Sequence, residues 1–218
     1  MRFELSVLRS TKIRQPVQKR SQAALARIFE SANALISARP FDQVSVSEIA
    51  EKAGVSVGSV YQRFKTKDDL LWALYEDYLE QAERQFEHVF AAAPKDADIQ
   101  VYVLSVVRTV ATLFQSRRGV VLSLLLRYRQ SPEDIPKPFI TRINKVYDLA
   151  MSHLAQASAY SSSNPKIRFV FSMIVASCRE EYLFQDTSKL MKKTQSATSF
   201  QNLLCAAVMG VLQSEKSK

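Results

Sequence analysis

The stretch EIAEKAGVSVGSVYQRFKTKDDLL, residues 48–71, holds two of the four glycines of this 218-residue chain, Gly54 and Gly58. Apolar residues around them recur at helical spacing, so the glycines interrupt an amphipathic pattern. A glycine just past a short helix favours a left-handed turn, because it has no Cβ to clash there. Ala50 and Val60 lie four residues before and six residues after Gly54. This spacing predicts a helix-turn-helix.

The second of the two short helices has two different faces. Apolar and aromatic residues at i, i+3, i+4 and i+7 predict an inward face made of Val57, Val60, Tyr61 and Phe64. The opposite face carries small or hydrogen-bonding residues: Ser56, Gly58, Ser59, Gln62 and Arg63. A helix with so slim a polar face can enter the major groove of DNA. Glycine-containing turns also occur in helical proteins that never meet DNA, but the neighbouring lysines favour the DNA interpretation.

The rest of the chain shows helical periodicity with almost no hairpin or period-2 signal, which predicts an all-α fold. Ser45 and Glu48 form a predicted capping box at the start of one helix. Pro94 closes a long helix that starts near Thr66. The expected helices, about nine in total, cover roughly 19–38, 45–54, 56–64, 66–94, 97–115, 117–130, 136–158, 165–186 and 197–213.

Composition sets broad limits on the function. A formal net charge of +9 points toward a polyanion such as nucleic acid or a membrane surface. Cys178 and Cys205 lie in apolar runs without ligand spacing, so we expect buried thiols and no metal or other cofactor. The N-terminal apolar segment is too short for a signal peptide, and the best membrane candidate, 194–214, has a polar first half. A soluble, cytoplasmic protein is the expectation.

The sequence SVSEIAEKAGVSVGSVYQRFKTKDDLL, preceded by RIFESANALISARPFDQV, resembles the N-terminal domain of the TetR family of transcriptional regulators. The resemblance covers about 19–71 and includes the pattern IA..AGVS.G..Y..F..K..LL without gaps. It departs from the family at Pro40, where glycine is usual, and at Gln62 and Arg63, where aromatic or histidine residues are common. The rest of the chain fits the family in length and helix number but carries no motif of its own.

The resemblance implies a domain organisation and a function. A flexible basic arm, 1–17, precedes a three-helix helix-turn-helix DNA-binding domain at 18–66, with the motif at about 45–64. A helical ligand-binding and dimerisation domain follows at 67–218. Such a protein is expected to act as a cytoplasmic homodimer on a palindromic operator in double-stranded DNA. It would be a repressor that responds to a small-molecule effector.

The same resemblance assigns DNA contacts residue by residue. The expected contacts are Ser45, Ser56, Val57, Gly58, Ser59, Tyr61, Gln62, Arg63, Lys65 and Lys67. Ser45 and Ser56 would hold phosphates, and Val57 and Ser59 would face bases or the sugar edge. Gln62 could read a base edge or a phosphate, and the Tyr61 hydroxyl and Lys67 would clamp the backbone. The alternatives are that the serines only cap helices and that Tyr61 is a core residue. Arg9, Lys12 and Arg14 could enter a minor groove or belong to a disordered tail.

The second half of the chain is rich in bases and aromatic residues. Residues 99–178 contain ten Lys or Arg but only three Asp or Glu. The family resemblance implies an effector pocket here, and the charge would suit an elongated anionic or acyl ligand. The candidate lining is Tyr102, Arg108, Phe114, Tyr128, Tyr147, Phe169 and Met173. The alternative is that the aromatic residues form the core and the arginines lie on the surface.

The last two expected helices are apolar nearly all round, which suggests a homodimer formed as a four-helix bundle. The candidate interface residues are Phe171, Val175, Phe200, Leu203, Leu204, Ala207, Val208 and Val211. An enzyme is disfavoured, because His88 and His153 lie near no Cys, Ser or acidic motif and no phosphate-binding glycine loop exists. A DNA-binding protein that acts architecturally, or through another protein without a small-molecule effector, remains an open alternative.

Overall fold

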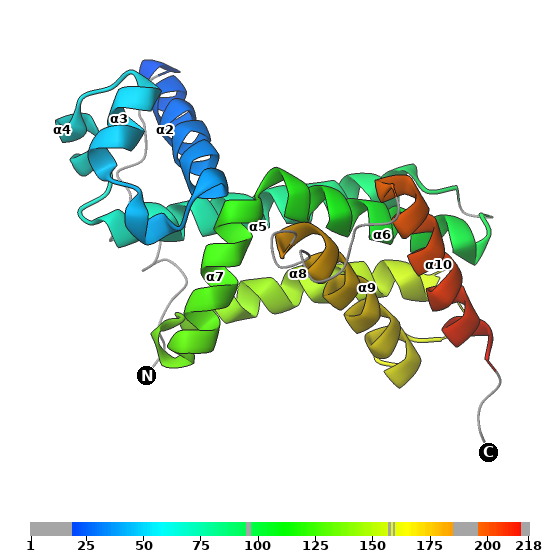
Figure 1. Ribbon diagram of the computed structural model, residues 1–218. Coiled ribbons are helices and arrows are strands. Elements are labelled where there is room, and N and C mark those ends of the chain that lie inside the picture. Colours follow the sequence, from blue (N-terminus) through cyan, green and yellow to red (C-terminus); the bar gives the residue numbers. More distant parts are fainter. Residues whose placement is uncertain (1–18, 95–96, 157, 159, 185–195, 215–218) are drawn as a thin grey trace. The chain divides into compact units, whose positions relative to one another are not determined.

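The computed structural model describes residues 19–94, 97–156, 158, 160–184 and 196–214. Within these residues it contains nine α-helices, two 3-10 helices and no strand, which confirms the all-α prediction. In chain order and with the labels of Figure 1, the elements are α2 (Lys19–Ala38), η1 (Phe41–Gln43), α3 (Val46–Ala53), α4 (Val57–Tyr61), α5 (Lys67–Ala92), α6 (Ile99–Ser116), α7 (Arg118–Gln130), η2 (Pro132–Asp134), α8 (Lys137–Gln156), α9 (Pro165–Leu183) and α10 (Ala197–Gln213).

Side-chain caps define several helix starts. The hydroxyls of Ser45, Ser56 and Ser196 each accept a hydrogen bond from the backbone N–H three residues later. Asn164 caps α9 in a similar way, by accepting from the Lys166 N–H, and Pro165 occupies the first helical position. The helix ends differ from the sequence expectation by a few residues. α4 is the clearest case, because it ends at Tyr61 rather than near residue 64.

The chain divides into two compact units. The first comprises residues 1–78 and 117–140, and the second comprises 79–116 and 141–218. Residues of the long helices α5 and α8 belong to both units. The units are defined by their internal contacts, so the predicted functional boundary after residue 66 remains a prediction.

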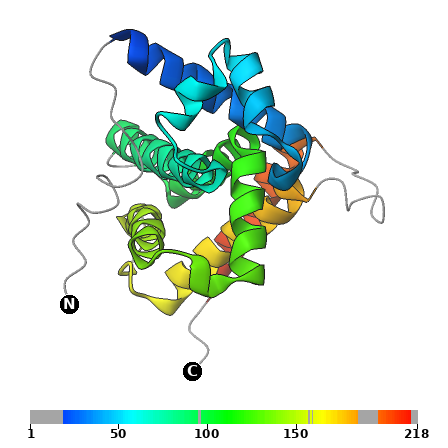
Figure 2. The same ribbon diagram turned by 90° about the vertical axis from the view of Figure 1, so that its left-hand side faces the viewer.

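The first unit is built around α2, which packs against both α3 and α7 (Figures 1 and 2). Ile28, Ala32 and Ile36 recur every fourth residue along α2 and are buried. α7 approaches the C-terminal end of α2 so closely that its second residue, Gly119, meets backbone instead of side chains. A Cβ at Gly119 would overlap the Ile36 carbonyl and lie 2.7 Å from the Ser37 nitrogen. The α2–α7 contact therefore requires glycine at position 119.

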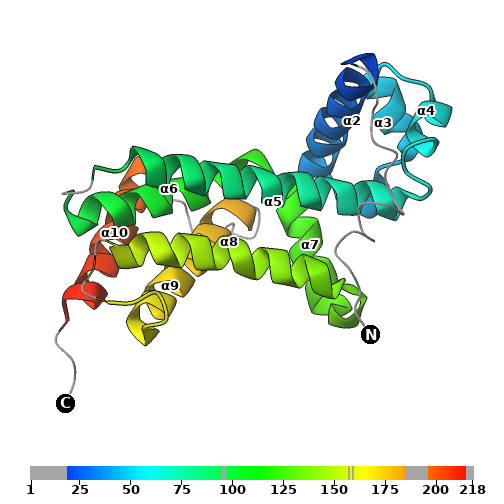
Figure 3. The same cartoon turned by 180° about the vertical axis from the view of Figure 1, so that it is seen from behind.

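The second unit contains a packed group of three helices, α6, α9 and α10, each of which contacts the other two (Figure 3). Its interior is aliphatic and includes Val106, Ile174 and Val208, which are all fully buried. By length and hydropathy, α6 is the one described helix that would suit a membrane span. Half of that helix is buried inside the protein, as expected for a core helix.

The burial of α9 and α10 corrects part of the predicted dimer interface. Phe171, Leu204 and Val208 are buried within the chain and are not available to a partner. Their helical period was right, but the face they form packs on α6 and on each other's helix. The exposed face of the two helices instead includes Phe169, Leu203, Ala206, Ala207 and Gly210. Val175, Phe200 and Val211 lie half-buried.

We expect Gly119→Ala to lower the free energy of unfolding by about 1–3 kcal/mol, because the new methyl group must push α7 away from α2. Gly58→Ala is the matched control, since a Cβ there would meet only the Ser56 hydroxyl oxygen, at 3.9 Å. The control should be neutral or stabilising by about 0.5–1 kcal/mol, the usual gain from glycine to alanine within a helix. Urea unfolding of both variants at one protein concentration measures the difference. Equal stabilities would contradict the proposed backbone contact at Gly119.

Candidate nucleic-acid interface

The turn between α3 and α4 is made by Gly54, which has a φ of 63° and a ψ of 40°. It is the only residue with positive φ in the described part of the chain. Its N–H donates to the Glu51 carbonyl at 3.1 Å, and the Val55 N–H donates to the Ala50 carbonyl at 3.0 Å. These two bonds close the last turn of α3. Because residues with a side chain rarely adopt this left-handed backbone conformation, the direction of α4 depends on glycine at this position.

Two apolar residues anchor α4 and the turn that follows it. Val60 and Phe64 are 1% exposed, and the Phe64 ring stacks on Phe29 of α2 at a centroid distance of 6.2 Å. The other two residues of the predicted inward face point outward, since Val57 is 37% exposed and Tyr61 is 50% exposed. The correction follows from the length of α4, because a five-residue helix has room for one anchoring residue rather than a full stripe.

The outer surface of α4 is small and polar. Val57, Gly58, Tyr61 and Gln62 are exposed and Ser59 is half-exposed, so these candidate contact residues form one accessible ridge along α4 and its C-terminal cap. The Ser56 and Ser59 hydroxyl oxygens lie 2.8 Å apart and share a hydrogen bond. Nothing in the fold requires glycine at position 58, because a Cβ there would meet ordinary contact only. The ridge could therefore carry a larger side chain without disturbing the chain itself.

The predicted phosphate contacts near the start of α3 are engaged in helix capping. The Ser45 N–H donates to a Glu48 carboxylate oxygen at 2.8 Å, and the Ser45 hydroxyl accepts from the Glu48 N–H at 3.2 Å. Glu48 also pairs with the Arg39 guanidinium. The Arg39 hydrogen bond, together with those from Ser45, lowers the pKa of Glu48 to about 2. The capping box predicted from the sequence is present.

Two of the predicted DNA-contacting cations are bound to the chain itself. The Arg63 guanidinium donates to the Ser21 carbonyl at 3.1 Å and to the Ser21 hydroxyl at 2.7 Å, at the start of α2. The Lys67 ammonium donates to the carbonyls of Phe41 and Asp42 in η1, at 2.7 and 3.3 Å. It also lies 4.3 Å from the centroid of the Phe41 ring. By contrast, Lys65 is exposed.

One positioning residue was missed in the sequence. Arg27 on α2 donates from Nε to the Ala53 carbonyl at 3.0 Å, at the end of α3 and directly before Gly54. A guanidinium at this place satisfies a carbonyl that the helix leaves unpaired and interacts favourably with the helix dipole. Periodicity along α2 gives no sign of this bond, because its partner lies 26 residues away. The predicted arm residues Arg9, Lys12 and Arg14 lie outside the described residues.

The predicted effector-pocket residues differ in how far they are buried. Tyr102 and Phe114 are buried, whereas Tyr147 and Phe169 are exposed and Met173 is half-buried. The remaining aromatic candidate, Tyr128, is exposed and belongs to the first unit. Helical spacing identified aromatic residues but not which of them face the core. Arg108 is the one candidate that lines a groove found in the second unit.

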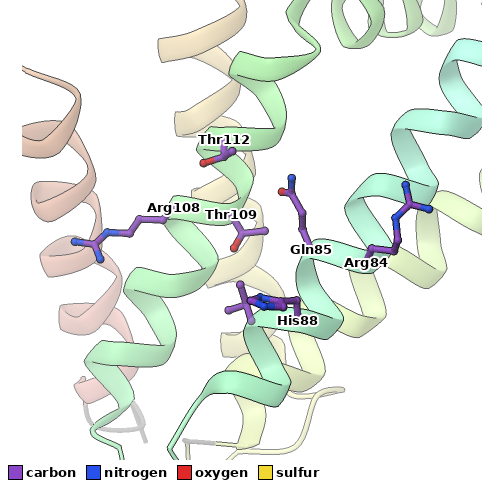
Figure 4. A pocket seen from close by; sticks show the side chains of 7 residues that line it. Arg84, Gln85, His88, Arg108, Thr109 and Thr112 are labelled. Carbon is purple, nitrogen blue, oxygen red and sulfur yellow. The ribbon is translucent and has the colours of Figure 1, made fainter. Parts of the chain in front are cut away.

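That groove lies between α5 and α6 and has a volume of about 310 Å³. Its lining comprises Arg84, Gln85, His88 and Val89 from α5 and Arg108, Thr109 and Thr112 from α6. In Figure 4, Gln85, His88, Thr109 and Thr112 lie between the two helices, and the guanidinium groups of Arg84 and Arg108 extend to opposite sides. No group of three or more His, Cys, Asp or Glu suited to a metal occurs among the residues whose placement is described.

Comparison with known proteins places this geometry in context. Residues 28–74 match the family model of bacterial regulatory proteins, tetR family. The chain is 29% identical over 113 residues to the HTH-type transcriptional regulator AcrR of Shigella flexneri, an alignment that spans 50% of each protein. The chain thus matches only half the length of this curated relative.

Solved structures share the fold over most of the chain. A tetR-family transcriptional regulator from Streptomyces coelicolor aligns with a TM-score of 0.66 at 19% identity, over 90% of this chain and 82% of its own. The Bacillus subtilis regulator FadR in complex with stearoyl-CoA aligns with a TM-score of 0.58, also at 19% identity, over 86% and 97%. Taken with the αL turn at Gly54, these findings show that residues 28–74 match the TetR family of bacterial regulatory proteins and that the chain shares the fold of solved TetR-family regulators.

Proposed function

We propose that this protein is a cytoplasmic repressor that binds a palindromic operator in double-stranded DNA as a homodimer and responds to a small-molecule effector. In this proposal residues 18–66 bind DNA and residues 67–218 bind the effector and form the dimer. The ridge of α4 reads the major groove, while serines and lysines around it hold phosphates. The protein acts by binding, and no catalytic step is part of the proposal.

The observation that carries the proposal is the exposed ridge of α4. Gly54 turns the chain, Val60 anchors the helix, and Gly58, Tyr61 and Gln62 are left accessible. Gln62 has both an amide donor and an acceptor, which suits bidentate pairing with adenine in the major groove. Gly58 supports the same role, because the chain's own packing makes no demand for glycine there. The net charge of +9 adds a sequence-independent attraction to DNA.

The exposed face of α9 and α10 supports the homodimer. Phe169 and Leu203 are 57% and 59% exposed, and Ala206, Ala207 and Gly210 continue this apolar surface along α10. Large exposed apolar side chains next to small residues are suited to close packing of a second helix pair. A two-fold dimer would present two α4 ridges to two half-sites, which is why the expected operator is a palindrome.

Two observations support an effector. The structural neighbour FadR was solved with stearoyl-CoA, an anionic acyl ligand. This chain has an excess of basic residues between 99 and 178 and a groove in its second unit whose lining contains two arginines and no acidic residue. Both are compatible with an organic anion as effector. Binding of such a ligand would shift the population toward a form with lower operator affinity.

Selection of bound sequences from random DNA tests the DNA-binding proposal. The expected result is a palindromic consensus with a specificity ratio of about 10³ or more over random sequence. A protein that acts architecturally would enrich little sequence and show a small ratio. That outcome would replace the operator-binding proposal with the architectural alternative.

We expect Lys65→Ala and Arg63→Ala to weaken operator binding in different ways. Lys65 is exposed, so loss of its phosphate contact should flatten the slope of log K against log salt by about 0.9. Arg63 is bound to Ser21, so its loss should leave the slope unchanged and lower specific affinity by misplacing α4. Fluorescence anisotropy across a salt series measures both. A flattened slope for Arg63→Ala would show that Arg63 contacts a phosphate instead.

Leu203→Glu is expected to convert the dimer to a monomer, because it places a charge in the middle of the apolar face. Operator affinity should fall at least about tenfold, since each monomer would bind one half-site alone. Gln130→Glu, at an exposed position on α7, is the control and should remain dimeric. Light scattering after size-exclusion chromatography gives the mass. A dimeric Leu203→Glu variant would place the interface elsewhere.

A further inference from the structure

The peptide group that joins Ala53 to Gly54 lies at the start of the turn before α4 and is hydrogen-bonded on both sides. Its N–H, which belongs to Gly54, donates to the Glu51 carbonyl at 3.1 Å, within the last turn of α3. Its carbonyl, which belongs to Ala53, accepts from Arg27 Nε on α2 at 3.0 Å. A flip of this peptide group would therefore break both hydrogen bonds at once.

Side-chain packing does not hold this turn. Gly54 is exposed, and a Cβ placed on it would have no atom within 4 Å apart from its two chain neighbours. Glycine adopts positive and negative φ about equally readily, so the residue type permits the left-handed turn without selecting it. The conformation of the turn therefore depends on its hydrogen bonds, and the one from Arg27 is donated by a different helix.

The helix that follows the turn has little packing of its own. Within α4 only Val60 is buried, so the helix is anchored at one residue along its length. A different backbone conformation at Gly54 would change the direction in which the chain enters α4. The ridge residues, Gly58 and Gln62 among them, would then be presented at a different angle.

The chemistry and the location of Arg27 suit it to hold this peptide group. The Ala53 carbonyl is one of the last four of α3, which the helix itself leaves without a partner. A charged donor forms a stronger hydrogen bond than a neutral one, and a cation is favoured at the C-terminal end of a helix. The next residue on α2, Ile28, is fully buried, and α2 packs against α3. Arg27 is thus presented to the turn by an anchored part of the fold.

We propose that Arg27 is a positioning residue for sequence recognition, which holds the Ala53–Gly54 peptide group in the left-handed turn and thereby fixes the direction of α4. This role rests on the DNA binding proposed above. It differs from the role of Arg63, which binds Ser21 after α4 has ended, because Arg27 acts on the turn that starts the helix. Arg27 itself contacts neither a base nor a phosphate in this proposal.

The hydrogen bond from Arg27 can be tested in the unmodified protein without DNA. In NMR spectra of the full-length chain, the Arg27 Nε proton should exchange with water about tenfold more slowly than that of Arg129, because it is bound to the Ala53 carbonyl. Arg129, at an exposed position on α7 in the same unit, is the matched control. Equal exchange rates for the two protons would overturn the proposal. This result decides alone if a variant of Arg27 does not fold.

Two variants separate a local role at the turn from general stabilisation. Arg27→Met keeps a long side chain and removes the donor, whereas Arg27→Lys keeps a charged donor. In Arg27→Met the backbone amides of Gly54 and Val55 should exchange with solvent about tenfold faster, while the amide of Ile36, in the buried part of α2, should be unchanged. Arg27→Lys should restore part of the protection. Unchanged exchange at the turn, or an equal loss of protection at all three amides, would overturn the proposal.

Binding to the selected operator and to a shuffled duplex of the same length tests the role in recognition. Arg27→Met should bind the operator about tenfold more weakly than the control Arg129→Met, and the two variants should bind the shuffled duplex equally. An equal loss on both duplexes, with a flatter salt dependence than the control, would show a phosphate contact and overturn the proposal.

The two sets of measurements keep this proposal distinct from the proposed function. A protein that shows no preference for any operator would reject the proposed function, while the exchange measurements would still decide whether Arg27 holds the turn. A variant that loses protection at Gly54 and Val55 but keeps the full preference for the operator would reject the role of Arg27 in recognition.

Discussion

The left-handed turn at Gly54 is the constraint on which the proposed DNA-binding surface depends. Glycine alone adopts this conformation without a clash, and the turn fixes where α4 leaves α3. α4 has only five residues and cannot bury a full apolar stripe, so its orientation is fixed by contacts at its ends. Arg27 binds the carbonyl just before the turn, and Arg63 binds the start of α2 just after the helix. Two charged residues thus support a ridge that is itself uncharged.

This arrangement separates positioning from recognition. Two basic residues that follow the ridge in the chain, Arg63 and Lys67, donate hydrogen bonds to Ser21 and to carbonyls of η1. The residues on the accessible side of the ridge are small or neutral, as with Gly58, Ser59 and Gln62. Neutral side chains add little to non-specific attraction, which comes mainly from cations. Sequence preference would therefore come from shape and hydrogen bonding at the ridge, supported by a general attraction from the basic chain.

The sequence predicted the fold well, because caps, prolines and glycines are local signals. Ser45, Ser56 and Pro165 mark helix starts that the structure contains. The sequence predicted less well which residues of each helix are buried and against what. Periodicity shows that a helix has an apolar side, but it does not show which neighbour covers that side. Phe171 and Leu204 were assigned to a partner and instead pack within the chain, and Val57 and Tyr61 were assigned inward and are exposed. The bond from Arg27 joins residues 26 apart and left no periodic signal.

The four glycines show how a residue that destabilises the isolated chain can indicate a binding surface. Gly54 is required by its backbone angle and Gly119 by the nearby backbone of α2, so the chain alone accounts for both. Gly58 and Gly210 lie within helices where a Cβ would meet no close contact, although glycine there costs about 0.5–1 kcal/mol. Both lie on surfaces proposed to pack against something else, DNA for one and a second copy for the other. A residue that makes the isolated chain less stable is expected at a binding surface. Selection for binding can retain such a residue there, whereas selection for stability alone would remove it.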